Sequence, residues 1–271
     1  MTSRLMQSGL AVAAMLATSL AAQAADIPVK GPVYKAVPAG PPAYNWAGFY
    51  IGGHLGGAWG SQDYTADAQG AWLTSPAFVS FINATGSPDF SPSSFTGGPQ
   101  IGYNWQFAPS WLAGIEADAH FMSLKSDNNT GFIADPSLAA NSRFIESAKT
   151  DWIATLRARI GWVSNNWLLY GTGGFAWGHV KSSWNFFRTS SGYDAFGSAD
   201  TTKSGWTVGG GLEYAFAPNW TLKGEYLYID LGDVNYRTFD RSGLFPTFFE
   251  NISMHTTVNI ASVGLNYKFG P

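Results

Sequence analysis

The chain has 271 residues, of which 12% are charged and 16% are aromatic, with 32 Gly, no Cys and a formal net charge of −3 at pH 7. Because a typical soluble domain is about 25% charged, this composition indicates a protein with an apolar exterior. The acidic balance argues against nucleic-acid binding, which needs a clustered basic surface, and the lack of Cys excludes disulfides and cysteine-ligated metals.

Residues 1–24 have the pattern of a secretory signal peptide. Arg4 supplies the positive charge, residues 9–20 are apolar, and Ala22-Gln23-Ala24 fits the small-x-small cleavage pattern. The alternative is an uncleaved transmembrane helix, but polar residues interrupt the apolar run, and a spanning helix needs about 20 mostly apolar residues. We therefore predict export and cleavage after Ala24.

Residues 25–45 contain five prolines, which oppose both helix formation and strand pairing. We predict a Pro-rich periplasmic lead-in, to which we assign no function. No later stretch approaches about 18 consecutive apolar residues, so we expect no helical anchor in the exported chain. The rest of the chain is then either soluble or a transmembrane β-barrel.

From Phe49 onward, apolar and polar residues alternate with a period of two. A helix would place Glu116 and Asp118 about 200° apart, whereas a strand places them on one face. The mean hydropathy of −0.04 fits strands with one lipid-facing and one polar face. The eight alternating segments are 49–59, 95–107, 111–121, 152–162, 167–177, 206–216, 220–228 with a continuation to 231, and 257–269.

The connections between these segments alternate between short and long. Three are tight turns at 108–110, 164–166 and 217–219, each followed by a Trp. The other four, residues 60–94, 122–151, 178–205 and 232–256, are long. A soluble sandwich would not repeat this rhythm, which is typical of outer-membrane barrels with short periplasmic turns and long extracellular loops. We predict an all-β, eight-stranded antiparallel up-and-down transmembrane β-barrel over residues 46–271, with four long extracellular loops, located in the outer membrane.

Aromatic residues beside the tight turns are expected to form an inner girdle at the level of the lipid headgroups, in contact with outer-membrane lipid. The predicted girdle consists of Phe107, Trp111, Trp167, Phe216, Trp220 and Phe269.

The inward faces of the strands carry charges of both signs. Eight strands close around an interior that side chains can fill, so we predict an ion-pair network that largely plugs the lumen. An acid–base pair of Glu116 and Asp118 is the alternative, but the matching Arg157 and Arg159 favour neutralisation. The predicted network consists of Glu116, Asp118, Arg157, Arg159, Glu213, Lys223, Glu225 and Lys268.

Catalytic and metal-binding motifs are missing from the sequence. The residues His54, His120, His179 and His255 lack metal-ligand spacing, and no Ser lies in a Gly-x-Ser-x-Gly elbow. We therefore predict no metal site, no cofactor and no enzymatic activity. The aromatic tract 244–249 contacts a ligand, lipopolysaccharide or a host surface in one interpretation, and packs within its own loop in another.

Five sequence blocks resemble those of the porin-family small outer-membrane proteins, the outer membrane immunogenic or opacity-like group of Gram-negative bacteria. The blocks are WAGFYIG at 46–52, QIGYNWQ at 100–106, YGTGG at 170–174, KGEYLY at 223–228 and VGLNYKF at 263–269. The resemblance covers about residues 46–269. It implies an eight-stranded barrel that supports envelope integrity and carries surface antigens, and for some relatives haem binding or the passage of small solutes.

Two positions depart from the family pattern. Members usually end on the aromatic residue that the barrel-insertion machinery reads, whereas Gly270 and Pro271 follow Phe269 here. Pro99 lies inside the second predicted strand, where it cannot donate a ladder hydrogen bond, so we expect a bulge or a strand end there.

Our leading functional hypothesis is a structural outer-membrane barrel that presents surface loops. The alternatives are a porin-like diffusion channel for small solutes and a protein that binds a host surface or a small molecule, such as haem, through its loops.

Overall fold

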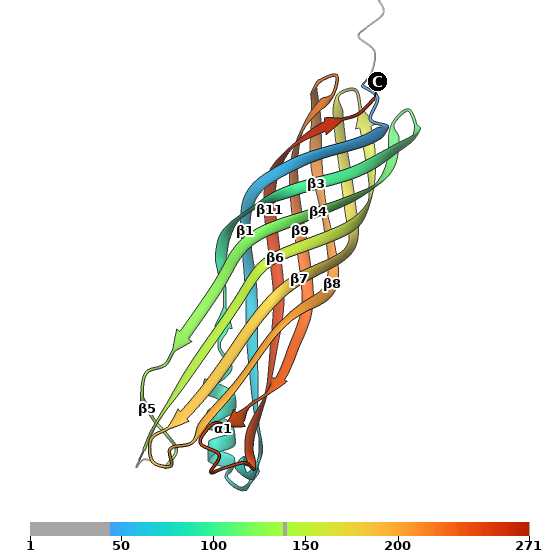
Figure 1. The fold of residues 1–271 in the computed structure, drawn as a ribbon. Helices are drawn as coiled ribbons and strands as arrows, with labels where there is room; N and C mark the ends of the chain where they lie inside the picture. The colour runs from blue at the N-terminus through green and yellow to red at the C-terminus, as the bar shows by residue number, and fades with distance from the viewer. Residues whose placement is uncertain (1–43, 138–139, 271) are drawn as a thin grey trace, which may run out of the picture. The chain divides into compact units, whose positions relative to one another are not determined.

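The computed structural model describes residues 44–137 and 140–270, so the predicted signal peptide and nearly all of the lead-in lie outside the described residues. Eight long antiparallel strands form a closed ring (Figure 1). The ring closes between the first and last strands, from the pair Tyr50–Lys268 to the pair Gly70–Phe248. The strands are β1 (Gly48–Gly70), β3 (Ser93–Ala108), β4 (Trp111–Asn129), β6 (Asn141–Ser164), β7 (Trp167–Arg188), β8 (Asp194–Ala217), β9 (Trp220–Arg237) and β11 (Phe248–Lys268). The predicted fold class is confirmed.

Three tight turns join β3 to β4, β6 to β7 and β8 to β9 at one end of the barrel, here called the turn end (Figure 1). The turns lie where the sequence predicts them, and each following strand begins at the predicted Trp. Asn165 has a φ of 53°, a left-handed conformation that Asn tolerates better than most residues. The opposite end is called the far end below.

Short elements lie between the long strands towards the far end. They are a 3-10 helix, η1 (Ala71–Thr74), the helix α1 (Pro76–Thr85), and the two-residue strands β2 (Asp89–Phe90), β5 (Ile133–Ala134) and β10 (Phe239–Asp240). Pro76 opens α1, at a position where its missing N–H costs no helical hydrogen bond. Within residues 44–137 and 140–270, no helix has the length and apolarity needed to cross a membrane.

The strands extend further towards the far end than the alternating segments do. β1 continues 11 residues past Trp59, and β6 begins at Asn141 rather than at Trp152. The long strands have between 16 and 24 residues, whereas a membrane strand needs about 9–11. Much of each predicted long connection is therefore strand, and the segments between the long strands are only 71–92, 130–140, 189–193 and 238–247.

Pro99 produces neither a bulge nor a strand end, so that expectation is wrong. β3 runs through it, and the pairs Gly97–Phe121 and Gln100–Asp118 on either side keep the same register with β4. Pro99 itself is paired with Gly53 of β1. The ladder thus tolerates one missing donor, because the flanking pairs hold the two strands in place.

A true bulge occurs in β6. Its register with β7 shifts between Thr150 and Ile153, and the register of β4 with β6 shifts at the same level, between Phe121 and Leu124. An extra residue in one strand moves the following side chains to the opposite face. Consequently even-numbered residues such as Trp152 and Leu156 face outward on the turn side, and odd-numbered residues such as Lys149 face outward on the far side.

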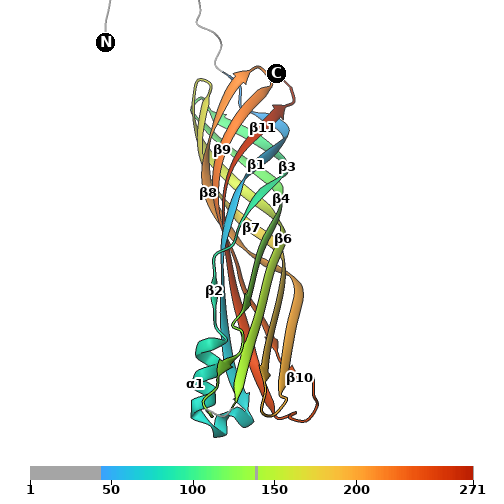
Figure 2. The same cartoon turned by 90° about the vertical axis from the view of Figure 1, so that its left-hand side faces the viewer.

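The far-end part of β1 is left without a long partner on one side, because β3 begins only at Ser93. The segment that contains α1 and β2 covers this edge (Figure 2). It provides acceptors for successive alternate amides, which would otherwise be exposed. These hydrogen bonds run from Gly60 N to Pro92 O, Tyr64 N to Pro88 O, Ala66 N to Ser87 Oγ and Ala68 N to Asn83 Oδ1, at 2.9–3.0 Å.

Candidate functional site

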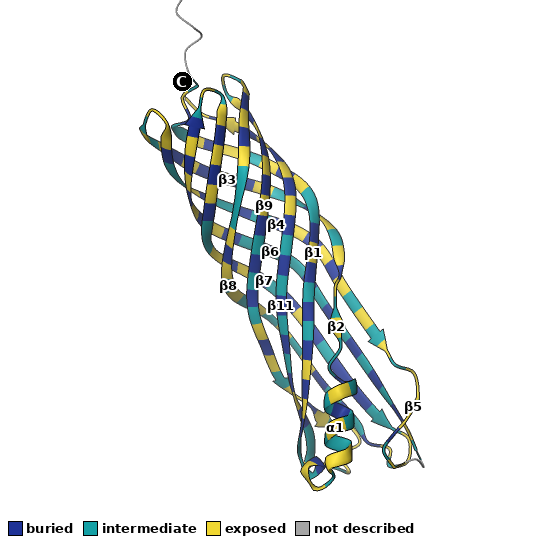
Figure 3. Ribbon diagram, turned by 180° about the vertical axis from the view of Figure 1, so that it is seen from behind, coloured by how far each residue is buried: buried dark blue, intermediate teal, exposed yellow. Residues whose placement is uncertain are grey.

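Exposed apolar side chains alternate with buried residues around the turn-side half of the barrel (Figure 3). The six residues predicted for the inner girdle are all exposed there, by 40–53%. A second aromatic row lies about ten residues further along the strands. It includes Trp59, Phe121, Trp177 and Trp206, which are also exposed. The sequence analysis gave this row no role, although each member ends or begins an alternating segment.

Arg157 lies at the centre of the lumen and is buried. Its Nη2 is 2.6 Å from Glu116 Oε1 and also contacts Asp118, and its Nη1 is 3.0 Å from Glu225 Oε2. The inward faces of β4 and β9 position these three carboxylates around one guanidinium from β6. Such charge-assisted contacts are stronger than neutral hydrogen bonds.

Arg159 and Lys223 extend the same cluster. Arg159 Nη1 is 3.1 Å from Glu213 Oε1 and 3.4 Å from Glu116 Oε2. Lys223 Nζ is 3.0 Å from Glu116 Oε1 and 3.4 Å from Glu225 Oε1. The structure thus brings seven of the eight predicted residues together. The eighth, Lys268, donates from Nζ to the Ala47 carbonyl oxygen at 3.3 Å, near the turn end.

The three cations and four carboxylates of this cluster are called the ionic layer below. Two tyrosines to which no role was assigned from the sequence also belong to it. Tyr50 donates to Glu116 Oε2 at 2.6 Å, and Tyr170 donates to Glu225 Oε2 at 2.8 Å. The Arg159 guanidinium lies 4.9 Å from the Tyr50 ring centre and 5.1 Å from that of Tyr170, within reach of a cation–π contact. The alternation in 49–59 places Tyr50 on the inward face, which was an available signal, whereas both faces of 167–177 are apolar or Gly, so the sequence gives no phase for Tyr170.

Glu116, Asp118 and Glu225 have oxygen atoms within 4.8 Å of one another, close enough to share a metal ion. However, Arg157 contacts all three, and Lys223 contacts two of them. Protein cations therefore already neutralise this acidic cluster, and its chemistry is that of an ion-pair network.

His54 and His120 lie next to the ionic layer on its far side. His120 Nε2 is 3.1 Å from Asp118 Oδ1, and the two imidazole rings are 4.3 Å apart. Both residues are buried, and neither ring nitrogen of His54 has a hydrogen-bond partner within the described ranges. From the sequence, these histidines were judged only for metal-ligand spacing, which they lack, and no other role was predicted for them.

Beyond the histidines, the interior of the barrel becomes apolar. The inward side chains there form one buried cluster with the far-end core. This apolar layer includes Met122, Leu124, Ile153, Val180, Leu227, Ile229, Leu231, Val258 and Ile260, all at most 9% exposed. The alternating pattern predicts charged residues in the lumen, and this apolar layer was not predicted from it.

The far end is held by a buried carboxylate, Glu250 on β11. It accepts hydrogen bonds from Trp72 Nε1 at 2.8 Å, from the Tyr193 hydroxyl at 3.3 Å and from the Thr238 hydroxyl. These donors come from three different connections. Burial raises the pKa of the Glu250 carboxyl to about 7.

Aromatic rings pack around this carboxylate and form a cap. The Trp72 ring lies 4.7–5.9 Å from the rings of Phe78, Phe186, Tyr193 and Phe248. Phe245 also packs on Tyr193, whereas Leu244 is 71% exposed. Phe245 and Phe248 of the aromatic tract 244–249 therefore pack within the far end, whereas Leu244, Pro246 and Thr247 are exposed.

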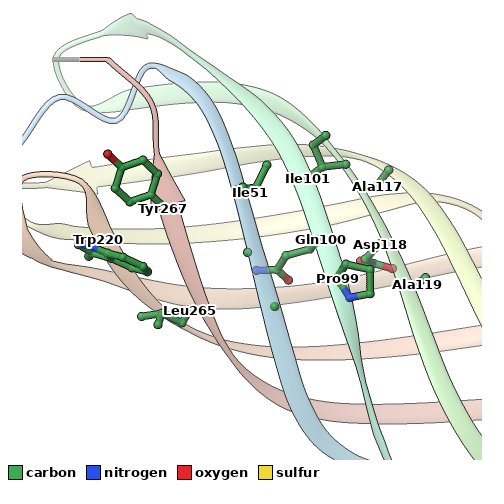
Figure 4. A pocket seen from close by; sticks show the side chains of 12 residues that line it. Ile51, Pro99, Gln100, Ile101, Ala117, Asp118, Ala119, Trp220, Leu265 and Tyr267 are labelled. Carbon is green, nitrogen blue, oxygen red and sulfur yellow. The ribbon is translucent and has the colours of Figure 1, made fainter.

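An apolar hollow of about 840 Å³ lies on the lipid-facing surface across β1, β3, β4 and β11 (Figure 4). It forms where Gly53, Pro99, Ala117 and Ala119 present small side chains between larger neighbours. Gln100 and Asp118 also line it, but their side chains bond inward to Asn266 and Arg157. The hollow therefore offers surrounding lipid an apolar surface and no catalytic group.

Comparison with known proteins agrees with this architecture. The family model described as "Outer membrane protein beta-barrel domain" matches residues 10–269. The chain belongs to this family of outer-membrane β-barrels. It is 38% identical to the 31 kDa outer-membrane immunogenic protein of Brucella melitensis biotype 1, over 95% of this chain and 97% of the relative. It is 28% identical to the 22 kDa outer membrane protein of Rhizobium leguminosarum bv. viciae, over 84% and 80%.

Similar solved structures are more distant. The outer membrane protein OprG of Pseudomonas aeruginosa is 15% identical with a TM-score of 0.44, over 82% of this chain and 97% of that chain. The outer membrane protease OmpT of Escherichia coli is 12% identical with a TM-score of 0.44, over 85% and 99%. The family membership and the Brucella and Rhizobium relatives place this barrel in the outer membrane. Because outer-membrane barrels have their short turns on the periplasmic side, we infer that the far end lies outside the cell.

Proposed function

We propose that this outer-membrane barrel is a structural, non-conducting and non-enzymatic protein that supports the envelope and presents its far end at the cell surface. The observation that carries the proposal is the stacking of two closed layers in the lumen. The ionic layer lies within the membrane, and the apolar layer follows it towards the outside.

The ionic layer supports the proposal because its cations and carboxylates form ion pairs with one another. Three cations, Arg157, Arg159 and Lys223, face four carboxylates from β4, β8 and β9. A passing solute would have to break contacts that are buried and mutually hydrogen-bonded, which is costly.

The apolar layer supports it independently. Leu124, Ile153, Leu227 and Ile229 have no exposed surface. A hydrated ion that crosses such a constriction loses its water without gaining polar partners, and hydrophobic constrictions close channels in this way. The rival diffusion-channel function would need an open polar path through this layer.

Single-channel recording in planar lipid bilayers tests the proposal. The mature barrel is expected to insert without producing discrete conductance steps, and proteoliposomes that contain it should not swell in small sugars. An established porin in the same bilayers serves as the control for sensitivity. Reproducible steps in the picosiemens range from the folded barrel would contradict a closed lumen and favour the diffusion channel.

Surface presentation has its own support in the names of the relatives, which are called immunogenic. Phe132, Phe239 and Leu244 are 55–71% exposed at the far end. Antibodies raised against the segment 238–247 should label intact cells. If they label only lysed cells, the far end does not reach the surface.

Export completes the proposal. Signal-peptide cleavage after Ala24 should give a mature protein that begins at Ala25, followed by the lead-in and the barrel. N-terminal sequencing of the protein from isolated outer membranes checks this, and a chain that still carries Arg4 would refute cleavage.

A further inference from the structure

The far-end part of the barrel has an outer face that the structural role leaves unused. On β9, β11 and β1, two cross-strand rows point outward: Asn235–Ser253–Thr65 and Arg237–Asn251–Asp67. On β1, Thr65 and Asp67 follow Trp59 of the second aromatic row by six and eight positions, or about 20–26 Å along the strand. The face therefore stands above the lipid band, on the side wall of the barrel rather than at its tip.

This face is polar and hollowed. A groove of about 400 Å³ lies among Thr65, Asp67, Asn235, Asn251 and Ser253. A second hollow of about 400 Å³ follows towards the tip, where Arg237 stacks 3.3 Å from the centre of the Phe249 ring and Phe239 is 58% exposed. The side-chain amides of Asn235 and Asn251 make no hydrogen bond to any described residue and can bind a ligand.

The outer face of the neighbouring wall is different. On β4, β6, β7 and β8, its charged side chains pair with each other, as in Lys125–Asp127 at 2.8 Å, Lys149–Asp151 and Lys181–Asp200 at 3.6 Å. Those groups already have partners along the wall. The face of β9, β11 and β1 instead offers uncommitted amides and hydroxyls beside aromatic rings. Its carboxylate, Asp67, accepts one hydrogen bond from Gln69 Nε2 at 2.7 Å.

We infer that this groove binds carbohydrate, and that its occupant is the core oligosaccharide of the lipopolysaccharide that surrounds the barrel. Planar amide and carboxylate groups each make paired hydrogen bonds to neighbouring sugar hydroxyls, and an exposed ring offers an apolar surface to the C–H face of a sugar. The height of the face indicates which carbohydrate binds there, because the sugars joined to the outer-leaflet lipid lie directly above the lipid band.

Binding of lipopolysaccharide to the folded mature barrel in detergent micelles tests the inference. The probes are lipopolysaccharide with a complete core, deep-rough lipopolysaccharide that ends at the first inner-core sugars, and heparin as a polyanion. The wild-type barrel should bind the complete-core form about tenfold more tightly than the deep-rough form, because several hydrogen bonds are added.

The variants locate the site. Asn235→Ala/Asn251→Ala should remove the preference for the complete core, and Ser253→Trp should do the same by filling the groove. The matched control is Thr202→Ala/Ser204→Ala, two exposed polar side chains on the far-end part of β8. A gel-mobility shift on boiling verifies that each variant is folded.

Three results would overturn the inference. The first is an unchanged preference in both groove variants. The second is equal affinity for the deep-rough form, which would mean that lipid or phosphate is recognised. The third is displacement of the complete-core form by heparin, which would indicate a site for polyanions rather than for neutral sugars.

Discussion

Arg157 connects β6 to β4 and β9 across the lumen through Glu116, Asp118 and Glu225. β4 is already paired with β6 through the ladder, with Glu116 opposite Arg157, but β9 is not a neighbour of β6, so its link to β6 depends on side chains. A guanidinium suits the position, because its planar fork serves several carboxylates at once. The single side chain therefore ties opposite walls of the barrel together.

Replacing this arginine should destabilise the barrel strongly. Arg157→Ala leaves three buried carboxylates without their shared cation, and breaking a buried pair costs about 3–5 kcal/mol. Unfolding by guanidinium chloride in lipid vesicles, followed by tryptophan fluorescence, measures the loss. Lys125→Ala is the control, since the exposed Lys125–Asp127 pair should contribute less than about 1 kcal/mol. Equal midpoints for the wild type and Arg157→Ala would refute a stabilising network.

Glu250 makes the far-end cap sensitive to pH. Burial raises the pKa of its carboxyl from 4.5 to about 7, so the folded cap binds a proton more tightly than the unfolded segment does. The resulting stability is fully present below about pH 4.5 and is lost as the pH rises through 7, in total about 3 kcal/mol.

Limited proteolysis of the far-end connections between pH 5 and pH 8 checks this prediction. The wild type should be cut faster at pH 8, whereas Glu250→Gln, which cannot ionise, should show a weaker dependence. Glu146 should contribute the remaining pH dependence of the cleavage rate, because burial raises the pKa of its carboxyl to about 7 as well. The double variant Glu146→Gln/Glu250→Gln should therefore be cut at nearly the same rate at pH 5 and pH 8. An undiminished pH dependence of its cleavage rate would show that other groups are responsible.

At the scale of single elements, the strand positions could be predicted only where the outer surface meets lipid. In β4 up to Phe121, apolar side chains point outward and polar ones inward. Beyond Phe121 the polarity reverses, with Met122 and Leu124 inward and Ser123 and Lys125 outward. The strand continues, but its outer surface meets water instead of lipid, and the pattern of apolar and polar residues is inverted. A strand prediction based on apolar outward residues therefore ends at the second aromatic row.

The edge of β1 shows how side chains of the connection 71–92, one of them in α1, complete an element. Ser87 Oγ and Asn83 Oδ1 accept from the amides of Ala66 and Ala68 at 2.9 Å. Removing both acceptors with Asn83→Ala/Ser87→Ala should speed hydrogen exchange of these two amides by at least about tenfold, because each loses its partner. The amide of Gly60, which donates to the Pro92 carbonyl, is the internal control. Unchanged exchange at Ala66 and Ala68 would mean that the strand edge is protected without these side chains.

At the scale of the barrel, two layers close the lumen one after the other, the ionic layer and the apolar layer. The sequence indicated seven members of the ionic layer, since charges of opposite sign recur on inward positions of adjacent strands. It did not indicate the apolar layer, because Met122, Leu124 and Val180 lie in stretches expected to be loops. Nor could it indicate that Trp72, Tyr193 and Thr238 meet at Glu250, which depends on how three connections fold together.

Two closures in series predict that opening one alone does not produce a channel. Glu116→Ala/Arg157→Ala removes an anion and its cation from the ionic layer, yet conductance in planar bilayers should stay near zero because the apolar layer still excludes hydrated ions. Adding Leu124→Ser, Leu227→Ser and Ile229→Ser to that pair should give measurable steps if the barrel remains folded, which a gel-mobility shift on boiling verifies. The three serine changes without the ionic pair are the matched control and should conduct little, since the ionic layer persists. Clear conductance from Glu116→Ala/Arg157→Ala alone would show that the ionic layer is the sole barrier and that the apolar layer does not close the lumen.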